Sequence, residues 1–248
     1  MKYVGIDIGS TASKVVVLDE DKKKILHTKL CPSGWNSRET SEDIRNWLET
    51  LDLGEMRIVA TGYGRVSVPY ADKTVTEITC HAKGALFLNP VDMTVIDIGG
   101  QDTKVIVVNN GMVSDFLMND KCSAGTGKFL EVMANRLGLT LEEMFEYASL
   151  GTPVQISSVC TVFAESEIIS LMGKGTSRED IASGVVHSIV KKVASLSLKR
   201  LENDEVFLTG GFCDSDFIVK ELSKELNAHV HTDKKARFAG AIGAAVLG

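Results

Sequence analysis

Two segments of this chain repeat one pattern of residues that suits the binding of a polyphosphate and a metal ion. The first is Val4-Gly-Ile-Asp-Ile-Gly-Ser-Thr-Ala-Ser-Lys-Val-Val-Val17, and the second is Ile96-Asp-Ile-Gly-Gly-Gln-Asp-Thr-Lys-Val-Ile-Val107. Each places an Asp between an apolar run and a glycine-containing bend, and a second apolar run follows. Backbone N–H groups at such a bend can approach a phosphate, and the carboxylate can hold a hydrated Mg²⁺. The repeat therefore predicts two hairpins that bind one nucleotide.

The repeat can also be read without a ligand, as an internal duplication of an ordinary core hairpin. In that reading the buried Asp at each tip needs a separate explanation, because burying an unpaired carboxylate costs free energy. When the segments are aligned without a gap, Asp7 matches Asp97 and Lys14 matches Lys104. We favour the nucleotide-binding interpretation.

The composition is that of an ordinary globular protein. With 248 residues, of which 44% are hydrophobic and 24% charged, the chain can form one large domain or two modest ones. No apolar run approaches the roughly 18 residues of a membrane span, and the N-terminus reads as a core strand rather than a signal peptide. The net charge of −6 gives no electrostatic reason to expect nucleic acid or an anionic membrane as a partner. Five irregularly spaced cysteines argue against a disulfide framework and favour a cytoplasmic location.

Hydrophobic periodicity predicts a mixed α/β chain in which the hairpins open two related halves. After the first hairpin we expect a strand at 24–30, a helix at 37–51, a strand at 57–60 and a helix at 77–88. After the second we expect a strand at 111–116, helices at 126–137, 141–150, 163–172 and 179–201, a strand at 205–209, a capped helix ending at 226 and a small-residue-rich element at 236–247. Lys191, Lys192, Lys199 and Arg200 are expected on the solvated face of the long helix. His229 and His231, which alternate on a predicted strand, are assigned no role.

A third glycine-rich feature, Gly210-Gly211, follows a predicted strand and precedes a helix that Asp214 or Ser215 caps. With the paired Asp hairpins, it makes the sequence resemble the superfamily of actin, sugar kinases and heat-shock-chaperone ATPases. The resemblance implies an actin-like ATPase fold of the α/β class, with ATP and Mg²⁺ in a cleft between two ribonuclease-H-like subdomains. We expect these subdomains at residues 1–90 and 91–248, with a C-terminal helix that can pack back on the first.

The same resemblance implies roles for individual residues. Asp7 and Asp97 would bind Mg²⁺ mainly through water and help to position the hydrolytic water. The implied nucleotide contacts are Gly9, Ser10, Thr11, Ala12, Ser13, Lys14, Gly99, Gly100, Gln101, Asp102, Thr126, Gly127, Gly210, Gly211 and Gly240. The superfamily does not say what the hydrolysis is for.

Two cysteines precede predicted helices, Cys122 before 126–137 and Cys160 before 163–172. The adjacent Ala124-Gly-Thr-Gly-Lys128 is not a P-loop, because the motif would put its first Gly at Cys122 and its Ser or Thr at Phe129. A helix N-terminus stabilises negative charge and so favours a thiolate that ligates metal. The remaining cysteines, which lack that setting and are read as core or incidental residues, are Cys31, Cys80 and Cys213.

Two thiolates per chain are too few for a four-iron cluster, which usually has four. Four are reached if two identical chains meet on a two-fold axis and each contributes Cys122 and Cys160. The residues alone leave two other readings open. They could be half-buried cysteines at helix starts, or ligands of a structural zinc ion at the same axis.

The two cysteine segments carry a closer resemblance. Asn119-Asp-Lys-Cys-Ser-Ala-Gly-Thr-Gly-Lys-Phe-Leu-Glu131 and Ile156-Ser-Ser-Val-Cys-Thr-Val-Phe-Ala-Glu-Ser-Glu167 are similar to the signature segments of ATP-dependent activators of 2-hydroxyacyl-CoA dehydratases. That family, of the BadF/BadG/BcrA/BcrD type, also contains ATPase subunits of benzoyl-CoA reductase and the reductases of double-cubane-cluster proteins. The similarity runs from Val4 to the Gly240–Ala245 tail. It implies a homodimer that shares one [4Fe-4S] cluster through Cys122 and Cys160 of both subunits.

The implied activity is one-electron reduction coupled to ATP hydrolysis. A ferredoxin or flavodoxin would supply the electron, and an iron–sulfur dehydratase or double-cubane-cluster protein would accept it. Two other functions remain open on the same scaffold. A sugar or carboxylate kinase would normally need substrate-binding insertions that this compact chain lacks. In a chaperone-like or filament-forming ATPase, replacing Cys122 or Cys160 would leave ATP turnover and assembly unchanged.

Overall fold

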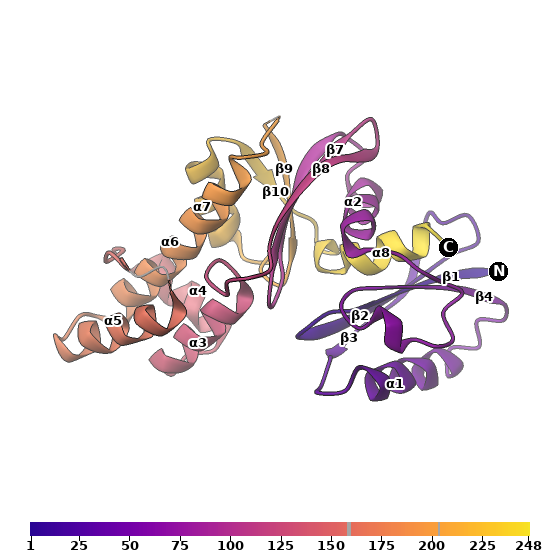
Figure 1. Ribbon diagram of the computed structural model, residues 1–248, viewed down its shortest axis with the longest axis horizontal. Coiled ribbons are helices and arrows are strands. Elements are labelled where there is room, and N and C mark those ends of the chain that lie inside the picture. Colours follow the sequence, from indigo (N-terminus) through magenta and orange to yellow (C-terminus); the bar gives the residue numbers. More distant parts are fainter. Residues whose placement is uncertain (158–159, 203) are drawn as a thin grey trace. The chain divides into compact units, whose positions relative to one another are not determined.

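The first sheet contains the first predicted hairpin at its centre (Figure 1). The structure is a computed structural model that describes residues 1–157, 160–202 and 204–248. β1 (Lys2–Ile8) and β2 (Ala12–Leu18) pair antiparallel, and β4 (Met56–Thr61) pairs with β1 in parallel. The edge strands are β3 (Ile25–Pro32) and β5 (Lys73–Thr74), which gives the order β3-β2-β1-β4-β5.

The second sheet repeats this plan around the second hairpin, with the order β10-β9-β6-β7-β8. β6 (Met93–Ile98) and β7 (Thr103–Asn109) form the hairpin, and β8 (Met112–Asn119) follows as an edge strand. β9 (Glu205–Gly210) lies on the other side of β6 and pairs in parallel with the short edge strand β10 (His229–His231). The predicted hairpins thus occupy corresponding places in two related sheets.

Helices connect the strands and flank the sheets. They are α1 (Ser37–Glu49), α2 (Glu77–Leu88), α3 (Gly127–Leu137), α4 (Leu141–Leu150), α5 (Thr161–Gly173), α6 (Arg178–Ser197), α7 (Asp216–Leu226) and α8 (Ala239–Val246), with short 3-10 turns η1 (Arg65–Ser67) and η2 (Ala236–Phe238). Within the described residues, none of these helices has the length and apolar composition needed to cross a membrane.

Most elements lie close to their predicted bounds because their start and stop signals are local. Ser215 caps α7 by accepting a hydrogen bond from the Ile218 N–H, as expected. The long helix was expected to reach residue 201, but α6 ends at Ser197, so Lys199 and Arg200 lie beyond it. Leucine and lysine favour helix, and their propensity extended the predicted helix past its real end.

Helices cover both faces of the first sheet. Successive side chains of β2 point to opposite faces, so they pack in two different cores. Val15 packs in a core with Ile44 of α1. Val16 packs in another core with Ile242 of α8. A strand buried on both faces reads as a continuous apolar run, which is how β2 appears in the sequence.

Packing divides the chain into two units. Unit 1 comprises residues 1–95, 106–116 and 233–248, and unit 2 comprises residues 96–105 and 117–232. These units are not contiguous in sequence, and the division into subdomains between residues 90 and 91 stays a prediction. α8, the last helix, belongs to unit 1.

α8 approaches its neighbours in unit 1 so closely that only glycine fits at the contacts. A Cβ added at Gly5 of β1 would overlap the carbonyl oxygen of Ala241. One added at Gly84 of α2 would overlap the carbonyl oxygen of Ala239, and Gly243 meets the backbone of α2 in the same way. The small residues of the last element therefore permit close helix packing, which Figure 1 shows for α8 beside α2.

Gly84→Ala should destabilise unit 1, because the added methyl would push α8 away from α2. Overpacking of this kind costs about 1–3 kcal/mol, so we expect a lower urea midpoint by circular dichroism. The matched control is Gly173→Ala in α5, where an added Cβ meets nothing within 4 Å. The control should hold or raise the midpoint, since Ala favours helix. Equal effects of the two substitutions would contradict the packing account.

Candidate functional site

Asp7 is buried at the end of β1, with 4% of its surface exposed. It pairs across the hairpin with Lys14, whose Nζ lies 3.9 Å from Asp7 Oδ2. Gly62 and Gly240 leave room for the carboxylate, because a Cβ at either position would crowd its oxygens. The structure thus brings Gly240, from the far end of the chain, to Asp7. It also adds Gly62 and the buried His81, which the sequence analysis did not place there.

The bend that follows β1 is held in a tight conformation by hydroxyl groups. The Gly9 N–H closes the bend with a backbone hydrogen bond of 3.2 Å, and the Ser33 hydroxyl donates to the Gly9 carbonyl at 2.6 Å. The buried Ser13 hydroxyl bonds to Ser33 at 2.8 Å, so it fixes the bend from inside. Ser10 and Thr11 remain exposed at the tip, where an anion can reach them.

Asp97 occupies the corresponding position in the second hairpin and is part of a buried ion cluster. Lys104 is only 2% exposed. Its ammonium lies 3.2 Å from Asp97 Oδ2 and 2.8 Å from Asp102 Oδ1. The Thr209 hydroxyl donates to Asp97 Oδ1 at 2.9 Å. Two carboxylates around one ammonium leave a net negative charge, which suits a hydrated divalent cation.

The lysines of the two hairpins differ in the number of nearby carboxylates and in exposure. Asp102 aligns with Ala12, so the first hairpin has one carboxylate near its lysine where the second has two. The Lys14 side chain is 20% exposed, whereas that of Lys104 is 3% exposed. Lys14 is therefore the one of the pair that solvent and a phosphate can reach.

The tip of the second hairpin is bonded to the start of α3. The N–H groups of Gly127 and Lys128 donate to the carbonyl oxygens of Gly99 and Gly100, each at 2.8 Å. A side chain at Gly127 would press on this contact, since its Cβ would lie 3.1 Å from the Gly99 oxygen. The glycines predicted around Asp97 and the first residues of α3 thus lie together within unit 2.

Gly210 and Gly211 end β9 beside the same hairpin. Gly210 has a φ of +92°, a conformation that glycine adopts without strain. The Gly211 N–H donates to the Ile98 carbonyl at 3.1 Å, which fixes the pair next to the strand that carries Asp97. The structure therefore brings this predicted feature to the second hairpin.

The two predicted cluster cysteines are both exposed and sit at the starts of neighbouring helices. Cys160 is the N-cap residue of α5, and Cys122 lies in the loop before α3. The hydroxyls of the next residues, Ser123 and Thr161, are hydrogen-bonded at 2.8 Å. The Asn119 side chain also donates to the Cys122 carbonyl at 2.9 Å. The Ser123–Thr161 contact joins the two cysteine segments directly, and motif spacing gives no sign of it.

Further polar contacts hold α3 and α5 together. Arg136 of α3 forms an ion pair with Glu165 of α5. Glu167 of α5 accepts hydrogen bonds from the N–H of Ser157 at 3.1 Å and from its hydroxyl at 2.9 Å. These acidic residues connect the helix that follows Cys160 to its surroundings.

The other cysteines have the core settings expected of them. Burial raises the pKa of the Cys80 thiol to about 12, so it stays protonated. Burial also raises the pKa of Cys31, which is half-buried, and Cys213 is buried. Their environments do not favour the thiolate that a metal requires.

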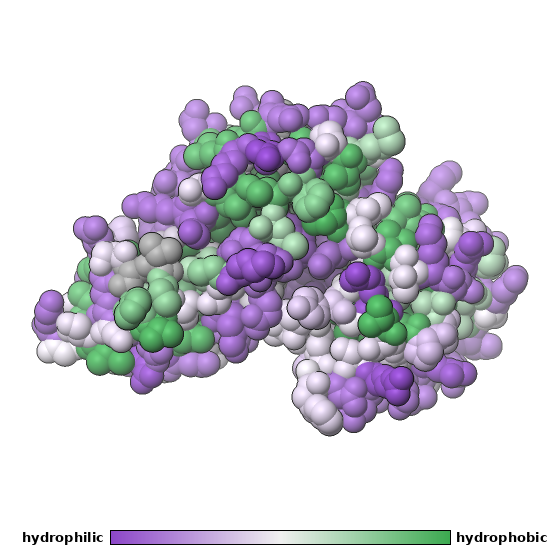
Figure 2. Space-filling view, viewed as in Figure 1, coloured by the Kyte–Doolittle hydropathy of each residue, from purple (hydrophilic) through white to green (hydrophobic). Residues whose placement is uncertain are grey.

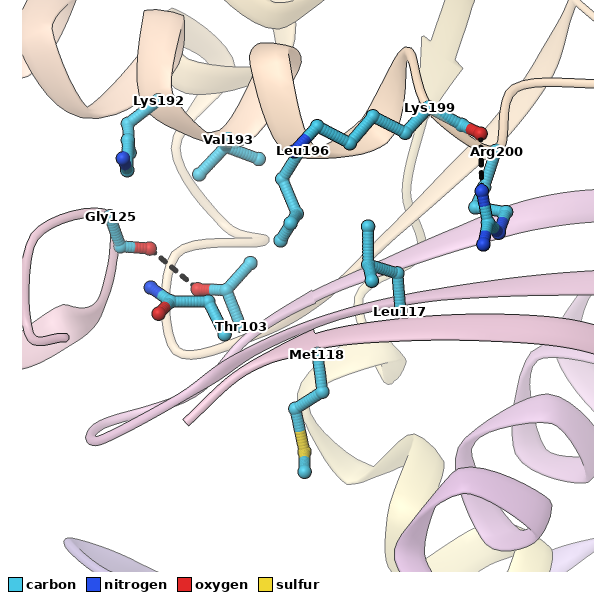
Figure 3. A pocket seen from close by; sticks show the side chains of 10 residues that line it. Thr103, Leu117, Met118, Gly125, Lys192, Val193, Leu196, Lys199 and Arg200 are labelled. Atoms are coloured by element: carbon cyan, nitrogen blue, oxygen red, sulfur yellow. Dashed lines mark hydrogen bonds between the residues drawn. The ribbon is translucent and has the colours of Figure 1, made fainter. Parts of the chain in front are cut away.

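A pocket of about 350 Å³ lies beside the loop that carries Cys122 (Figure 3). Lys192, Lys199 and Arg200 line one side of it. Thr103 lines the other and donates a 2.5 Å hydrogen bond to the Gly125 carbonyl. Lys192 and Lys199 are exposed, as expected, and together with Arg200 they border this pocket.

Large apolar side chains are exposed along α5. Val162 and Phe163, which follow Cys160, are each 67% exposed, and Ile169 and Met172 are about half-exposed. Figure 2 shows hydrophobic side chains at the surface in the region where α5 lies in Figure 1. Such a group of exposed apolar side chains is typical of a protein contact surface.

The sequence is similar to proteins of one family along its whole length. Residues 4–248 match the BadF/BadG/BcrA/BcrD ATPase family. The (R)-2-hydroxyglutaryl-CoA dehydratase activating ATPase of Acidaminococcus fermentans is 43% identical, over 98% of this chain and 95% of that protein.

Solved structures of similar activators have the same fold as this chain. The crystal structure of component A of that dehydratase has a TM-score of 0.94, with 42% identity over 100% of this chain and 97% of the other. The activator of the 2-hydroxyisocaproyl-CoA dehydratase from Clostridium difficile, solved with bound ADPNP, has a TM-score of 0.93, with 38% identity over 100% of this chain and 94% of the other.

More distant structures share the fold alone. A ROK family glucokinase from Streptomyces griseus has a TM-score of 0.66 and 16% identity, covering 100% of this chain and 99% of the other. This confirms the predicted actin-like ATPase fold and says nothing about substrate. The match over residues 4–248, together with the identity to the A. fermentans protein, shows that this chain belongs to the BadF/BadG/BcrA/BcrD ATPase family.

Proposed function

We propose that this protein is an ATP-dependent activator. It hydrolyses ATP and passes single electrons at low potential to an iron–sulfur partner, either a 2-hydroxyacyl-CoA dehydratase or a double-cubane-cluster protein. Its similarity to an activating ATPase supports this function. The structural observation that carries the proposal is a continuous path of contacts in unit 2, from the Asp97 hairpin to both exposed cysteines.

The path begins where a phosphate would bind. The tip of the β6–β7 hairpin is bonded through Gly99 and Gly100 to the first N–H groups of α3. The N-cap residue of α3, Thr126, donates its hydroxyl to the Ser123 carbonyl at 2.7 Å. Ser123 follows Cys122 and bonds to Thr161, which follows Cys160. A shift of the tip can therefore reach both cysteine segments through hydrogen bonds and a few peptide units.

Nucleotide binding is assigned to the two hairpin tips and the glycines beside them. Asp7 and Asp97 would hold Mg²⁺ through water and would orient the attacking water. The phosphate contacts in the first hairpin are Gly9, Ser10, Thr11, Ala12, Ser13 and Lys14, and those in the second are Gly99, Gly100, Gln101 and Asp102. Thr126, Gly127, Gly210, Gly211 and Gly240 complete the set.

The cysteines of the chain fit a shared four-iron cluster. Cys122 and Cys160 are its exposed thiols, and the other three are half-buried or buried. A cluster with four thiolate ligands then needs two copies of the chain, in line with the exposed apolar side chains of α5 beside Cys160. Such a cluster, when bound, stores and releases one electron. A ferredoxin or flavodoxin is the proposed donor.

The coupling has a thermodynamic requirement. ATP and ADP must favour different arrangements of the hairpin tips, because a ligand without differential affinity shifts no equilibrium. About 59 mV of one-electron driving force corresponds to about 1.4 kcal/mol. A shift of a few hundred millivolts therefore needs a coupling on the order of several kcal/mol, which favours hydrolysis over a contact change alone.

Asp7→Asn and Asp97→Asn should each lower ATP turnover by about 100-fold or more, because each removes a carboxylate that holds Mg²⁺ and orients water. Phosphate release under saturating Mg-ATP measures this. Asp92→Asn is the matched control: Asp92 precedes β6 at the end opposite Asp97, where it caps the turn at Asn110 and Gly111. If Asp7→Asn and Asp97→Asn each hydrolysed ATP at the wild-type rate, the roles assigned to these two residues would be wrong.

Cys122→Ser and Cys160→Ser should each yield colourless protein after anaerobic purification, with ATP hydrolysis retained and electron transfer to the partner lost. Iron and sulfide analysis, with the absorption spectrum, tests this. Cys31→Ser, which changes a half-buried thiol, should keep the full iron content of about four per dimer. Wild-type protein without iron or sulfide would overturn the cluster assignment and leave the ATPase assignment standing.

Thr161→Val removes the hydroxyl that joins the cysteine segments while keeping the side-chain shape. Iron content should be unchanged, and the ATP-induced shift in reduction potential should shrink by roughly 20–60 mV, the equivalent of one hydrogen bond of about 0.5–1.5 kcal/mol. Potentiometric titration with and without a non-hydrolysable ATP analogue measures it. Thr161→Ser retains a hydroxyl and should restore the shift. If the ATP-induced shift in reduction potential of Thr161→Val equalled that of wild type, this contact would not transmit the effect of ATP to the cysteines.

A further inference from the structure

Three side chains that the proposed function does not use meet at the β10 edge of the second sheet. The parallel register pairs His229 with Glu205, and His231 lies two residues farther along β10 on the same face. The Glu205 Oε2 atom is 3.4 Å from His229 Nδ1 and 3.7 Å from His231 Nδ1. One ligand atom from each residue lies within 4.8 Å of the others.

The two separations from Glu205 are close to the ligand spacing of a tetrahedral metal ion, and the third pair of ligand atoms lies within 4.8 Å. Zinc bonds to imidazole nitrogen and carboxylate oxygen at about 2.0–2.2 Å, so tetrahedral angles place neighbouring ligand atoms about 3.4 Å apart. The observed 3.4 and 3.7 Å separations require little movement to reach that arrangement. A strong hydrogen bond from an imidazole to a carboxylate would be shorter, at about 2.7–2.9 Å.

The surrounding structure holds the imidazoles in place. The rings of His229 and His231 stack with centroids 5.0 Å apart and an interplanar angle of 19°. The His231 ring also packs edge-on against the buried Phe207 at 5.2 Å. The side chains of His229 and Glu205 are 69% and 47% exposed, so an ion can enter from solvent. Part of the ordering that metal binding demands is thus already present.

We propose that Glu205, His229 and His231 form a binding site for a divalent transition-metal ion of the zinc or cobalt type, with water in the open position. Two imidazoles and one carboxylate favour such ions over Mg²⁺, which prefers oxygen ligands. The ion would clip β10, a strand of only three residues, to β9. This site is independent of the cysteines and of the Asp7 and Asp97 hairpins.

Equilibrium dialysis of the anaerobically purified full-length protein against Zn²⁺, followed by elemental analysis, tests the proposal. Wild-type protein should bind one zinc per chain more than His229→Gln, whose exposed side chain can be changed without loss of fold. His27→Gln, which changes an exposed histidine on β3, should bind as much as wild type. Comparing variants cancels any zinc that the cysteines take up.

Two further measurements make the outcome decisive. Zinc should raise the apparent melting temperature of wild type by several degrees and leave that of His229→Gln unchanged, because an ion that binds only the folded state stabilises it. In heteronuclear spectra, zinc should shift the ring nitrogens of His231 in wild type and not in Glu205→Gln. Equal zinc content in wild type and His229→Gln, or unshifted His231 nitrogens, would overturn the proposal.

Discussion

The buried ammonium of Lys104 is the constraint on which the second hairpin depends. A charge with 2% exposure is tolerated only with compensating partners, and here Asp97 and Asp102 supply them. The lysine thereby fixes the direction of both carboxylates, and Thr209 fixes the remaining oxygen of Asp97. In the first hairpin Lys14 has one carboxylate near it and is more exposed, so the two copies differ in how accessible their lysine is.

The contacts at the start of α3 continue from this hairpin toward the cysteines. Helix N-termini carry N–H groups without partners inside the helix. In α3 two of these groups are satisfied by the hairpin tip, at Gly99 and Gly100, instead of by a side-chain cap. Hydrogen bonds therefore connect the tip to the helix, and the helix N-cap to the loop that bears Cys122. Lys192 and the other cations beside that loop add positive charge near the same segment.

The sequence predicted the features that local patterns encode. The α/β class, the actin-like fold, the paired hairpins and the family were all predicted and are confirmed. The nucleotide contacts and the cluster ligands stay predictions, although within each unit the structure brings several of them together. Contacts such as Thr209 with Asp97, Gly62 with Asp7, or Ser123 with Thr161 join residues far apart in sequence, which periodicity and motif spacing cannot reveal. β5 was missed because a two-residue strand has no period to detect.

The position of α8 in unit 1 also constrains when that unit can form during synthesis. The first sheet is made early, but the helix that covers one of its faces lies among residues 233–248. Until those residues emerge from the ribosome, Val16 and its neighbours on that face lack the contacts of α8, and so does the glycine surface of α2. Unit 2 lies between these pieces in the chain, so its residues are all translated before unit 1 can be completed. The packing of α8 on this face therefore has to wait until nearly the whole chain has been synthesised.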